Sequence, residues 1–478
     1  MRRWLWAGQA LFGAGLLVAV ADYLPSPPAV SFPNPAGQQS SYRIGGDPLT
    51  LTGPFFEPLA ASGRSCSTCH KPEQGWGLSA EELRARFERT QGLDPVFRAN
   101  DGANCDHGLD TSTVEDRRSA YSLLVDRGVI RISLAVPADA QFEVVRVENP
   151  YGCGQRSQLS MYRRPLPATN LRFLTSVMWD GRESSVETGT QALTDEPRSA
   201  GLTADLAHQA LTAAKVHALA DGLTPQQQNA LVTFEMSLVT AQQTDRDAGP
   251  LDAGGAKGGT AQLAANTTPG FFVGMNDSHG GDPHGIKAEN AFRLFDDWSK
   301  LPYGRVYQEV PGYEDAQSKN RDRIARGQVL FNQRPFDIRG VAGLNDKLKL
   351  ASITGACGTC HNTPNAGSHS VPTEMNTGVA DLGGPLDLSY LPKITLRNKT
   401  TGDLETTTDP GRALVTGKWA DIGKMKIPVL RGLAARAPYF HNGSARSLPD
   451  VIDFYNKRFQ IGLSERDKED LVAFLNAL

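Results

Sequence analysis

Two copies of the motif Cys-x-x-Cys-His constrain this chain more than any other feature of its sequence. They occupy residues 66–70 and 357–361. This spacing is the attachment signature of c-type haem, in which both thiols bond to the haem vinyl groups and the adjacent histidine reaches the iron. A thioredoxin-like redox pair or half of a zinc site would not require the histidine and would have to arise twice. We therefore predict two covalent haem c groups. The predicted haem-binding residues are Cys66, Cys69, His70, Cys357, Cys360 and His361.

The N-terminus has the pattern of an export signal. Arg2 and Arg3 provide a positively charged start, residues 11–20 form an apolar run, and Ala19-Val20-Ala21 offers a cleavage site. The run is short for a membrane-spanning helix, which needs about 20 apolar residues, and an uncleaved anchor is the alternative. We expect a signal peptide at residues 1–21, a periplasmic location and no membrane span in the mature form.

The overall charge narrows the choice of partner. The 478 residues carry 49 Lys and Arg against 52 Asp and Glu, which gives a formal net charge of −3. This balance gives no reason to expect nucleic acid or an anionic membrane as a partner. A small redox partner or a small-molecule substrate fits better.

Local patterns recur in the same order in the two halves of the chain. The segment at residues 223–234 has the same spacing as that at 463–474, and each is typical of an amphipathic helix that opens with a Thr or Ser N-cap. The turn at residues 178–181, Met-Trp-Asp-Gly, is echoed by Phe-His-Asn-Gly at residues 440–443. With one haem motif in each half, this order predicts two cytochrome c-type domains.

The remaining segments suggest how the chain is divided. Residues 24–37 are rich in Pro and Ser, residues 248–259 are rich in Gly, Ala and Asp, and the alternation within residues 128–147 suits a β-hairpin. A disulfide between Cys105 and Cys153 would hold that β-containing insertion, since export permits one. We expect a mainly α fold in which both cytochrome c-type domains carry one haem. The expected divisions are an extended lead-in at 22–44, an N-terminal cytochrome c domain at 45–247 with an insertion at 76–160, a linker or loop at 248–270, and a C-terminal cytochrome c domain at 271–478.

In this arrangement the chain resembles the bacterial diheme cytochrome c peroxidase and MauG superfamily. The resemblance covers residues 45–478 and rests on both haem motifs, on Pro-Ala-Thr-Asn at 167–170, on Trp-Asp-Gly-Arg at 179–182 and on Ala-Pro-Tyr-Phe-His-Asn-Gly at 437–443. It implies an enzyme that reacts with hydrogen peroxide at one haem and exchanges electrons with the other haem through Trp179. Without the resemblance, Trp179 would be read as a core tryptophan with its N–H bonded locally.

The resemblance also singles out a second ligand for the second iron. Many members have a methionine after the Ala-Pro-Tyr-Phe-His segment, whereas MauG-like members have a tyrosine, and the matching residue here is Tyr455. A phenolate favours ferric iron, and a thioether favours ferrous iron. Met375 and Met425 are the competing thioethers, and a tyrosine that only packs near the haem is the other alternative.

The first iron has no matching distal histidine. Members typically have one shortly after the first motif, but the only histidine here between that motif and Trp179 is His107. We therefore expect an iron open to peroxide, with His107 as the alternative ligand. Cleavage of the O–O bond needs an acid-base group. The family pattern assigns that role to Gln191 and Glu196, with Glu187 as the rival of Glu196.

The family's calcium site between the haems is in doubt in this chain. Arg164 stands where members have a ligating asparagine, although backbone carbonyls near Arg436 and Pro438 are still available. His441 would lie near the edge of the second haem rather than on its iron. The other histidines have no matched role; they are His208, His217, His279, His284 and His369.

Together these features predict a periplasmic diheme peroxidase. Hydrogen peroxide would be reduced at the N-terminal haem, and the His361/Tyr455-ligated haem would store or relay electrons from a small periplasmic donor. A MauG-like oxidase that modifies a partner protein is the first alternative, favoured by Tyr455. A diheme electron carrier without catalysis is the second, but a carrier would need neither Tyr455 nor the Trp179 segment.

Overall fold

The computed structural model describes residues 29–45, 47–153, 156–185, 199–266, 274–280, 291–300 and 316–478. Helices account for 33% of the described residues and strands are also present, so the expected mainly α fold is confirmed only in part. Within the described ranges, no helix is both long and apolar enough to cross a membrane. The signal peptide expected at residues 1–21 lies outside the described residues.

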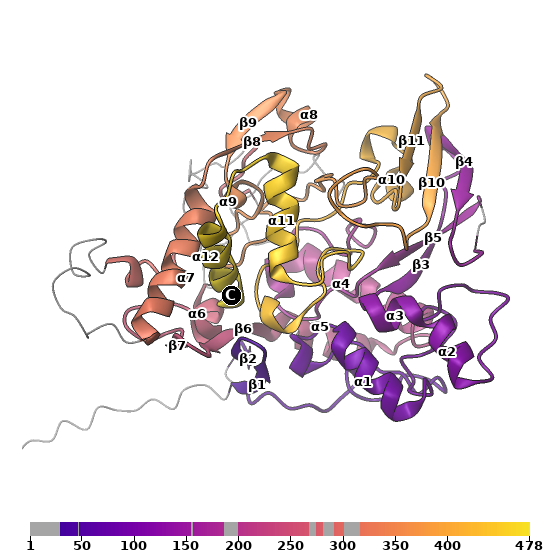
Figure 1. The fold of residues 1–478 in the computed structure, drawn as a ribbon. Helices are drawn as coiled ribbons and strands as arrows, with labels where there is room; N and C mark the ends of the chain where they lie inside the picture. Colours follow the sequence, from indigo (N-terminus) through magenta and orange to yellow (C-terminus); the bar gives the residue numbers. More distant parts are fainter. Residues whose placement is uncertain are drawn as a thin grey trace, which may run out of the picture.

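Helices and strands are interspersed along the chain (Figure 1). The described α-helices are α1 (Ala80–Thr90), α2 (Val114–Ala120), α3 (Ser122–Arg127), α4 (Ser199–Val216), α5 (Pro225–Ser237), α6 (Gly259–Ala265), α7 (Ala316–Gln333), α8 (Asn345–Leu348), α9 (Cys357–Cys360), α10 (Ala413–Thr416), α11 (Leu448–Phe459) and α12 (Glu465–Asn476). The described strands are β1 (Val30–Asn34), β2 (Gly37–Arg43), β3 (Ile130–Ala135), β4 (Phe142–Glu148), β5 (Gln158–Arg163), β6 (Leu238–Asp245), β7 (Gly249–Pro250), β8 (Phe336–Arg339), β9 (Ser352–Gly355), β10 (Lys393–Asn398) and β11 (Leu404–Thr407). They form four sheets with the orders β1-β2-β6-β7, β11-β10-β4, β3-β5 and β8-β9.

The repeated helices α5 and α12 begin where the sequence predicts. Thr224 caps α5, and its hydroxyl accepts the backbone N–H of Gln227. Ser464 caps α12 in the same way, by accepting the backbone N–H of Asp467 at 3.2 Å. Each cap satisfies an N–H that the first helical turn leaves unpaired, which is why these short motifs fix the helix start.

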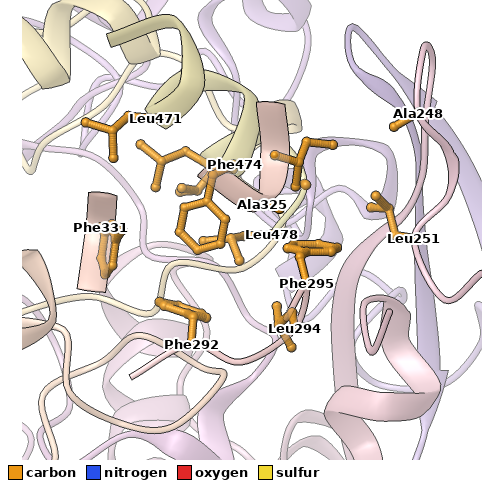
Figure 2. Packing of buried hydrophobic residues seen from close by; sticks show 14 of the residues in the cluster. Ala248, Leu251, Phe292, Leu294, Phe295, Ala325, Phe331, Leu471, Phe474 and Leu478 are labelled. Carbon is orange, nitrogen blue, oxygen red and sulfur yellow. The ribbon is translucent and has the colours of Figure 1, made fainter. Parts of the chain in front are cut away.

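The largest apolar cluster lies where α7, α11 and α12 pack together (Figure 2). Phe331 of α7 and Phe474 of α12 contact Phe292, with ring centroids 5.4 and 5.3 Å from that of Phe292. Gly327 lets the two helices approach closely, since a Cβ there would collide with the backbone carbonyl of Asp470. This cluster supports the side of the molecule that carries the second haem motif.

Three expectations about the connecting segments are wrong. The first concerns residues 22–44, which were expected to form an extended lead-in outside the core. Their described part forms β1 and β2, and β2 pairs with β6 in an antiparallel arrangement. The buried face of β2 is polar: the Ser41 hydroxyl lies 2.8 Å from that of Thr240 and accepts the indole N–H of Trp76 at 2.8 Å. Hydrophobic alternation could not reveal a strand whose buried residues, Gln39, Ser40 and Ser41, are all polar.

The second concerns the hairpin expected within residues 128–147. Both strands exist, but β3 pairs with β5, and β4 pairs with β10 from the other half of the chain. Phe142, Leu159, Met161, Ile394 and Leu396 form one buried cluster, so each strand takes the partner that completes this shared core. Alternation predicts a strand but not its partner. The insertion is thus tied to the second half by β4.

The third concerns residues 248–270, which were expected to form a linker. In the described part, Ala248 and Leu251 are fully buried in the large apolar cluster, and α6 packs against β6. Small alanine and glycine side chains here allow close packing, which composition alone did not separate from flexibility. The division into the domains 45–247 and 271–478 stays a prediction.

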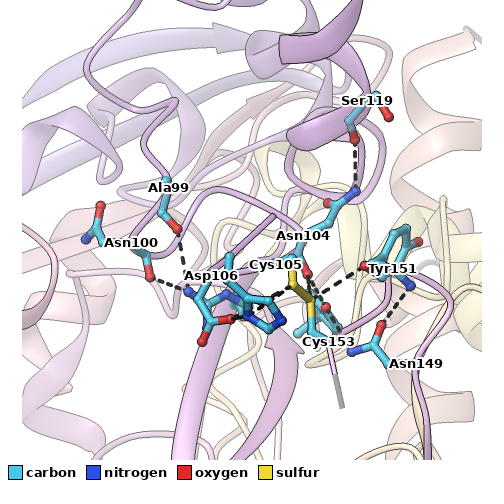
Figure 3. Close-up of a disulfide and its surroundings, with 12 residues drawn as sticks. Ala99, Asn100, Asn104, Cys105, Asp106, Ser119, Asn149, Tyr151 and Cys153 are labelled. Carbon is cyan, nitrogen blue, oxygen red and sulfur yellow. Dashed lines mark hydrogen bonds and ion pairs between the residues drawn. A yellow bond between two sulfur atoms is a disulfide. The ribbon is translucent and has the colours of Figure 1, made fainter. Parts of the chain in front are cut away.

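Cys105 and Cys153 form a disulfide with their Cα atoms 5.6 Å apart (Figure 3). It joins the turn that precedes α2 to the segment between β4 and β5. Asn104, beside it, donates its side-chain amide to the backbone carbonyl of Ser119 at 3.0 Å. The disulfide therefore holds the insertion, as the sequence allowed.

Candidate haem cavity

The two haem motifs fold into the same turn. Cys66 opens a 3-10 turn, and its carbonyl accepts the backbone N–H of His70 at 2.9 Å. Cys357 opens α9, and its carbonyl accepts the backbone N–H of His361 at 3.1 Å. In both cases one turn of backbone brings the two thiols and the imidazole together, as covalent haem attachment requires.

A threonine at the same position stabilises each turn. The Thr68 hydroxyl accepts the backbone N–H of Ser65 at 2.9 Å. The Thr359 hydroxyl accepts the backbone N–H of Ala356 at 3.0 Å. The residue before each motif is therefore fixed by the third residue of that motif, which gives the thiols a defined direction.

Each motif histidine is oriented by a carbonyl six residues further along. His70 Nδ1 donates to the carbonyl of Trp76 at 3.1 Å, and His361 Nδ1 donates to that of Gly367 at 2.7 Å. A carbonyl only accepts, so the proton lies on Nδ1 and the lone pair on Nε2. Burial lowers the pKa of both imidazoles to about 4, which keeps them neutral. A neutral, hydrogen-bonded imidazole of this kind is what an iron ligand needs.

One continuous cavity of about 420 Å³ reaches both motifs. All four motif cysteines line it, and none of them forms a disulfide. Burial raises the pKa of Cys66, Cys357 and Cys360 to about 12, so they remain thiols in the apolar surroundings. The lining joins both halves of the chain, and it includes Trp179, His441 and Tyr455.

Buried nitrogen atoms without a hydrogen-bond partner line this cavity and fit the carboxylates of haem. Arg436 lines the cavity, yet its Nε and Nη2 are buried without a hydrogen-bond partner in the described part of the chain. His441 also lines the cavity, and its Nε2 makes no hydrogen bond within the described residues, although it lies 3.9 Å from Asp409 Oδ2. Burial lowers the pKa of Arg436 to about 9. Buried guanidinium nitrogens are rarely left unpaired, so an anionic group such as a haem propionate suits this position. The residues present therefore fit two haem c groups.

Trp179 is held where the two halves meet. Its indole N–H donates to the backbone carbonyl of Arg164 at 2.8 Å, and its own carbonyl accepts the N–H of Lys426 at 2.7 Å. Its ring lies edge-on to that of His441, with centroids 6.1 Å apart. The backbone N–H of Arg164 in turn donates to the carbonyl of His441 at 2.6 Å. Each half thus anchors the aromatic turn of the other half.

The two turns themselves have the same backbone. Met178 and Phe440, which precede Trp179 and His441, have positive φ values of 69° and 64°. Gly181 and Gly443, which close the turns, both have φ values of 71°. A positive φ is costly for residues other than glycine, so its repetition at the matched positions is a shared structural device rather than a coincidence of sequence.

The Arg164 side chain decides whether calcium fits between the motifs. Its guanidinium donates to the carbonyls of Leu78 at 2.5 Å and Arg436 at 2.9 Å, and more weakly to those of Arg127 and Gly128. Burial lowers its pKa to about 10, which still leaves it cationic near neutral pH. Because a cation already engages the Arg436 carbonyl, these residues do not fit a calcium ion.

A buried ion network lies next to Trp179. Arg163 contacts Asp180 at 2.5 Å and makes a two-pronged contact with Asp409 at 2.7 and 2.8 Å. Arg182 also contacts Asp180, at 3.0 Å. The neighbouring guanidinium groups hold the pKa of Asp180 well below its usual range despite burial. Asp409 comes from the second half, so this network joins the halves at the turn that carries Trp179.

Tyr455 lies on α11 beside the second motif. Its ring stacks on Phe459, with centroids 6.2 Å apart, and meets Phe440 edge-on. Burial raises the pKa of the phenol well above its usual range. Met375 and Met425 line the same cavity and pair with each other through both backbone N–H groups. The structure thus brings all three candidate ligands to the cavity without choosing among them.

Within its described residues, the structure does not bring the remaining sequence-based candidates to the cavity. Gln191, Glu196 and Glu187 lie outside the described residues. His107 has a side chain 57% exposed, pairs with Asp106 and does not line the cavity. It is therefore poorly placed to reach the first iron.

Two polar side chains that line the cavity were not predicted from the sequence. His217 lines the cavity on the side of the first motif, and its Nδ1 lies 2.7 Å from an Asp101 carboxylate oxygen. Glu235 of α5 also lines it, and burial raises the pKa of this carboxyl to about 8. Glu235 was visible only as an acidic residue inside an otherwise apolar helix pattern, and His217 carried no signal at all.

The chain is similar to curated cytochrome-c peroxidases. The chain is 36% identical over 190 residues to cytochrome-c peroxidase IdrP2 of Denitromonas iodatirespirans, a match that takes in 36% of this chain and 48% of the relative. It is 30% identical over 200 residues to cytochrome-c peroxidase IdrP1 of Pseudomonas sp. (strain SCT), taking in 38% of this chain and 45% of the relative. The chain thus spans about half the length of the curated relatives it matches. No protein-family model matches the chain.

A solved structure gives a weaker comparison. The crystal structure of a MauG-like protein associated with microbial copper homeostasis matches 89% of this chain and 87% of its own, at 16% identity and a TM-score of 0.33. A score this low does not support an argument about the fold.

Proposed function

We propose that the chain is a diheme peroxidase of the superfamily of bacterial diheme cytochrome c peroxidases and MauG-like proteins, since it is 36% and 30% identical to cytochrome-c peroxidases over about half of their length. Cys66, Cys69 and His70 would hold the haem at which hydrogen peroxide is reduced, and Cys357, Cys360 and His361 would hold the haem that exchanges electrons with it. The observation that carries the proposal is the single cavity lined by both motifs and by Trp179. When bound, the haems supply the redox-active iron.

The chain's own residues fix the iron-binding imidazoles. His70 and His361 each keep Nδ1 on a carbonyl, which leaves Nε2 free to bind and prevents rotation of the ring. The cavity wall around both positions is mostly apolar, which favours a neutral imidazole. The same histidine arrangement would therefore serve both haems. Any difference in their reactivity must come from other residues that line the cavity.

Trp179 is proposed to carry electrons between the two sites. Its indole is fixed at both its N–H and its backbone carbonyl, and its ring meets His441 edge-on. The Arg163 network next to it holds the halves in register. A rigid aromatic ring in the wall shared by both sites is suited to electron exchange because little has to move.

Tyr455 is proposed as the second ligand at the His361 site, with Met375 and Met425 as rivals in the same wall. A phenolate there favours a MauG-like oxidase that modifies a partner protein, which is the second candidate function. We keep Gln191 and Glu196 as the proposed acid-base pair for peroxide cleavage, and Glu187 as the rival of Glu196. Glu235 is an additional proton-bearing group in the wall near Cys66. The proposed location is the periplasm, where a small electron donor or a protein substrate would meet the enzyme.

Stopped-flow spectroscopy of the fully ferric protein mixed with hydrogen peroxide tests the proposal. We expect a rapid change of the Soret band without prior reduction, followed by turnover when a reduced small cytochrome is supplied. A change that appears only after one-electron reduction would overturn the open first iron and make His217 the first ligand to test. No change under either condition would leave an electron carrier and defeat the peroxidase.

A further inference from the structure

Two histidines and an aspartate meet in the second half, apart from the haem cavity. Asp277 and His279 come from the described turn at residues 274–280, and His369 follows the second haem motif in the chain. None of the three lines the haem cavity. Their ligand atoms all lie within 4.8 Å of one another, and the two imidazoles meet edge-on with centroids 5.9 Å apart.

Each imidazole has one nitrogen fixed by a neutral acceptor. His279 Nε2 lies 3.1 Å from the carbonyl of Gly343, and His369 Nδ1 lies 3.3 Å from the side-chain oxygen of Asn362. Exchanging the positions of the Asn362 amide oxygen and nitrogen would break two hydrogen bonds. Its Nδ2 donates to the carbonyl of Asn276, and its oxygen accepts the backbone N–H of Ser370. Protons therefore lie on His279 Nε2 and His369 Nδ1. The lone pairs are left on His279 Nδ1 and His369 Nε2.

His369 Nε2 is buried without a hydrogen-bond partner in the part of the chain that the structure describes. The whole residue is only 2% exposed. Burial lowers its pKa to about 3, with the nearby His279 and His361 as smaller causes, so the ring is neutral. An acceptor lone pair in the protein interior costs about 1–3 kcal/mol when nothing satisfies it. A cation between the three side chains would satisfy it.

The spacing and the outer contacts suit a metal ion rather than a direct hydrogen bond. His279 Nδ1 lies 3.6 Å from Asp277 Oδ1, too far for a hydrogen bond. Ligand atoms that each lie about 2.1 Å from one ion are about 3–4 Å apart, so a small closure would complete the set. Asp277 Oδ1 is positioned by the backbone N–H of His279, which donates to it at 2.9 Å. Metal-binding histidines commonly donate their other N–H to a carbonyl or an amide oxygen, as both do here.

We propose that Asp277, His279 and His369 bind a divalent transition-metal ion of the Zn²⁺ type through one carboxylate oxygen and two imidazole nitrogens. This donor set suits zinc and its first-row neighbours, whereas calcium and magnesium prefer oxygen ligands alone. Three protein ligands leave at least one position for water or another ligand. The site differs from the group formed by Cys105, Asp106 and His107, where the cysteine is already in the disulfide.

The site is coupled to the second haem motif through the chain. Asn362, which orients His369, directly follows His361. An ion at the site therefore places positive charge near His361, and we expect it to raise the potential of the second haem more than that of the first. The proposal does not depend on peroxidase activity, because binding can be measured on its own.

Zn²⁺ binding to the chelator-treated diheme protein tests the proposal. Isothermal titration should give one Zn²⁺ per chain with a higher melting temperature, and Ca²⁺ at the same concentration should not compete. The variants His369→Gln and Asp277→Asn should each weaken binding about 100-fold or more while both haem spectra are kept. His208→Gln is the matched control, since that side chain is 70% exposed and remote in sequence.

Anomalous diffraction at the zinc edge would locate the ion. A peak between Asp277, His279 and His369 is the expected result. A stoichiometry well below one, unchanged affinity in both site variants, or a peak elsewhere would each overturn the proposal. Should His369→Gln fail to fold, Asp277→Asn alone still decides between these results.

Discussion

At the first haem motif the cavity is bounded by small side chains of α4 and by a buried acid, whereas at the second it is bounded by aromatic rings and thioethers. Ala210 and Ala213 belong to the first wall, together with Glu235. Tyr455 and Met425 belong to the second. The turn, the threonine hydroxyl and the histidine contact are nearly the same at both motifs. The haem-attachment turns are thus alike, whereas the residues that line the cavity differ between the two motifs. We therefore expect any difference in reactivity between the two haems to depend on these lining residues.

The largest effect should come from removing attachment itself. Replacing Cys66 and Cys69 by serine should remove only the first haem, and the same change at Cys357 and Cys360 should remove only the second. The reason is that each turn is closed by its own local hydrogen bonds. The pyridine haemochrome ratio should fall from two to one in each variant. A variant that loses both haems would show that the two regions do not fold independently and would break the comparison.

The largest kinetic effect should be on electron exchange between the two regions. Trp179→Phe removes the N–H that donates to Arg164 and reduces the aromatic surface between the halves. We expect peroxide still to react at the first haem, while oxidation of the second slows by about tenfold or more, which corresponds to about 1.4 kcal/mol of barrier. Stopped-flow traces at wavelengths that separate the two haems provide the measurement. Unchanged oxidation of the second haem would make Trp179 a core residue only.

Particular residues show which parts of the fold and of the site could be predicted from the sequence. The haem turns, Trp179, the N-caps at Thr224 and Ser464, and the neighbourhood of Tyr455 were predictable, because each depends on a short motif with a local physical cause. The pairing of β4 with β10 was not, since a strand's partner depends on which edge completes a core.

Burial of polar groups was the other limit of the sequence. Ser41 and Glu235 look like surface residues in a hydrophobic pattern, yet both are buried. The metal ligands His279 and His369 come from two separate loops, so only the folded chain brings them together.

The ion network between the two regions should affect stability next. Asp409→Asn removes one of the two carboxylates that pair with the buried Arg163. We expect the free energy of unfolding to fall by about 3–5 kcal/mol. Asp180 keeps a depressed pKa in the folded state, so its contribution is present above the unfolded pKa and is lost as pH falls below about 4. Urea unfolding from pH 3 to 8 provides the measurement. Glu143→Gln, which removes the exposed contact with Arg397, is the control and should cost less than about 1 kcal/mol.

The smallest effect on stability should come from Glu235, which lines the cavity near the first haem motif. The folded pKa of Glu235, about 8, is raised by burial, so the folded protein keeps a proton that the unfolded chain releases. Its contribution is favourable at low pH and is lost as pH rises from about 4.5 through 8. Glu235→Gln should therefore be more stable than the wild type near pH 7, by about 1–3 kcal/mol, and should lack that slope. Parallel pH dependences for the two proteins would mean that the acid is not protonated in the folded state.

Electron paramagnetic resonance of the fully ferric protein, before and after one equivalent of peroxide, tests the central claim most directly. The account predicts a high-spin signal from the open iron held by His70 and a low-spin signal from the iron held by His361 and Tyr455. Peroxide should diminish both signals, and in Tyr455→Phe the second iron should start from a different signal and respond less. Two low-spin signals that peroxide does not alter would contradict the account, because both irons would then be closed and the two walls would not differ in function.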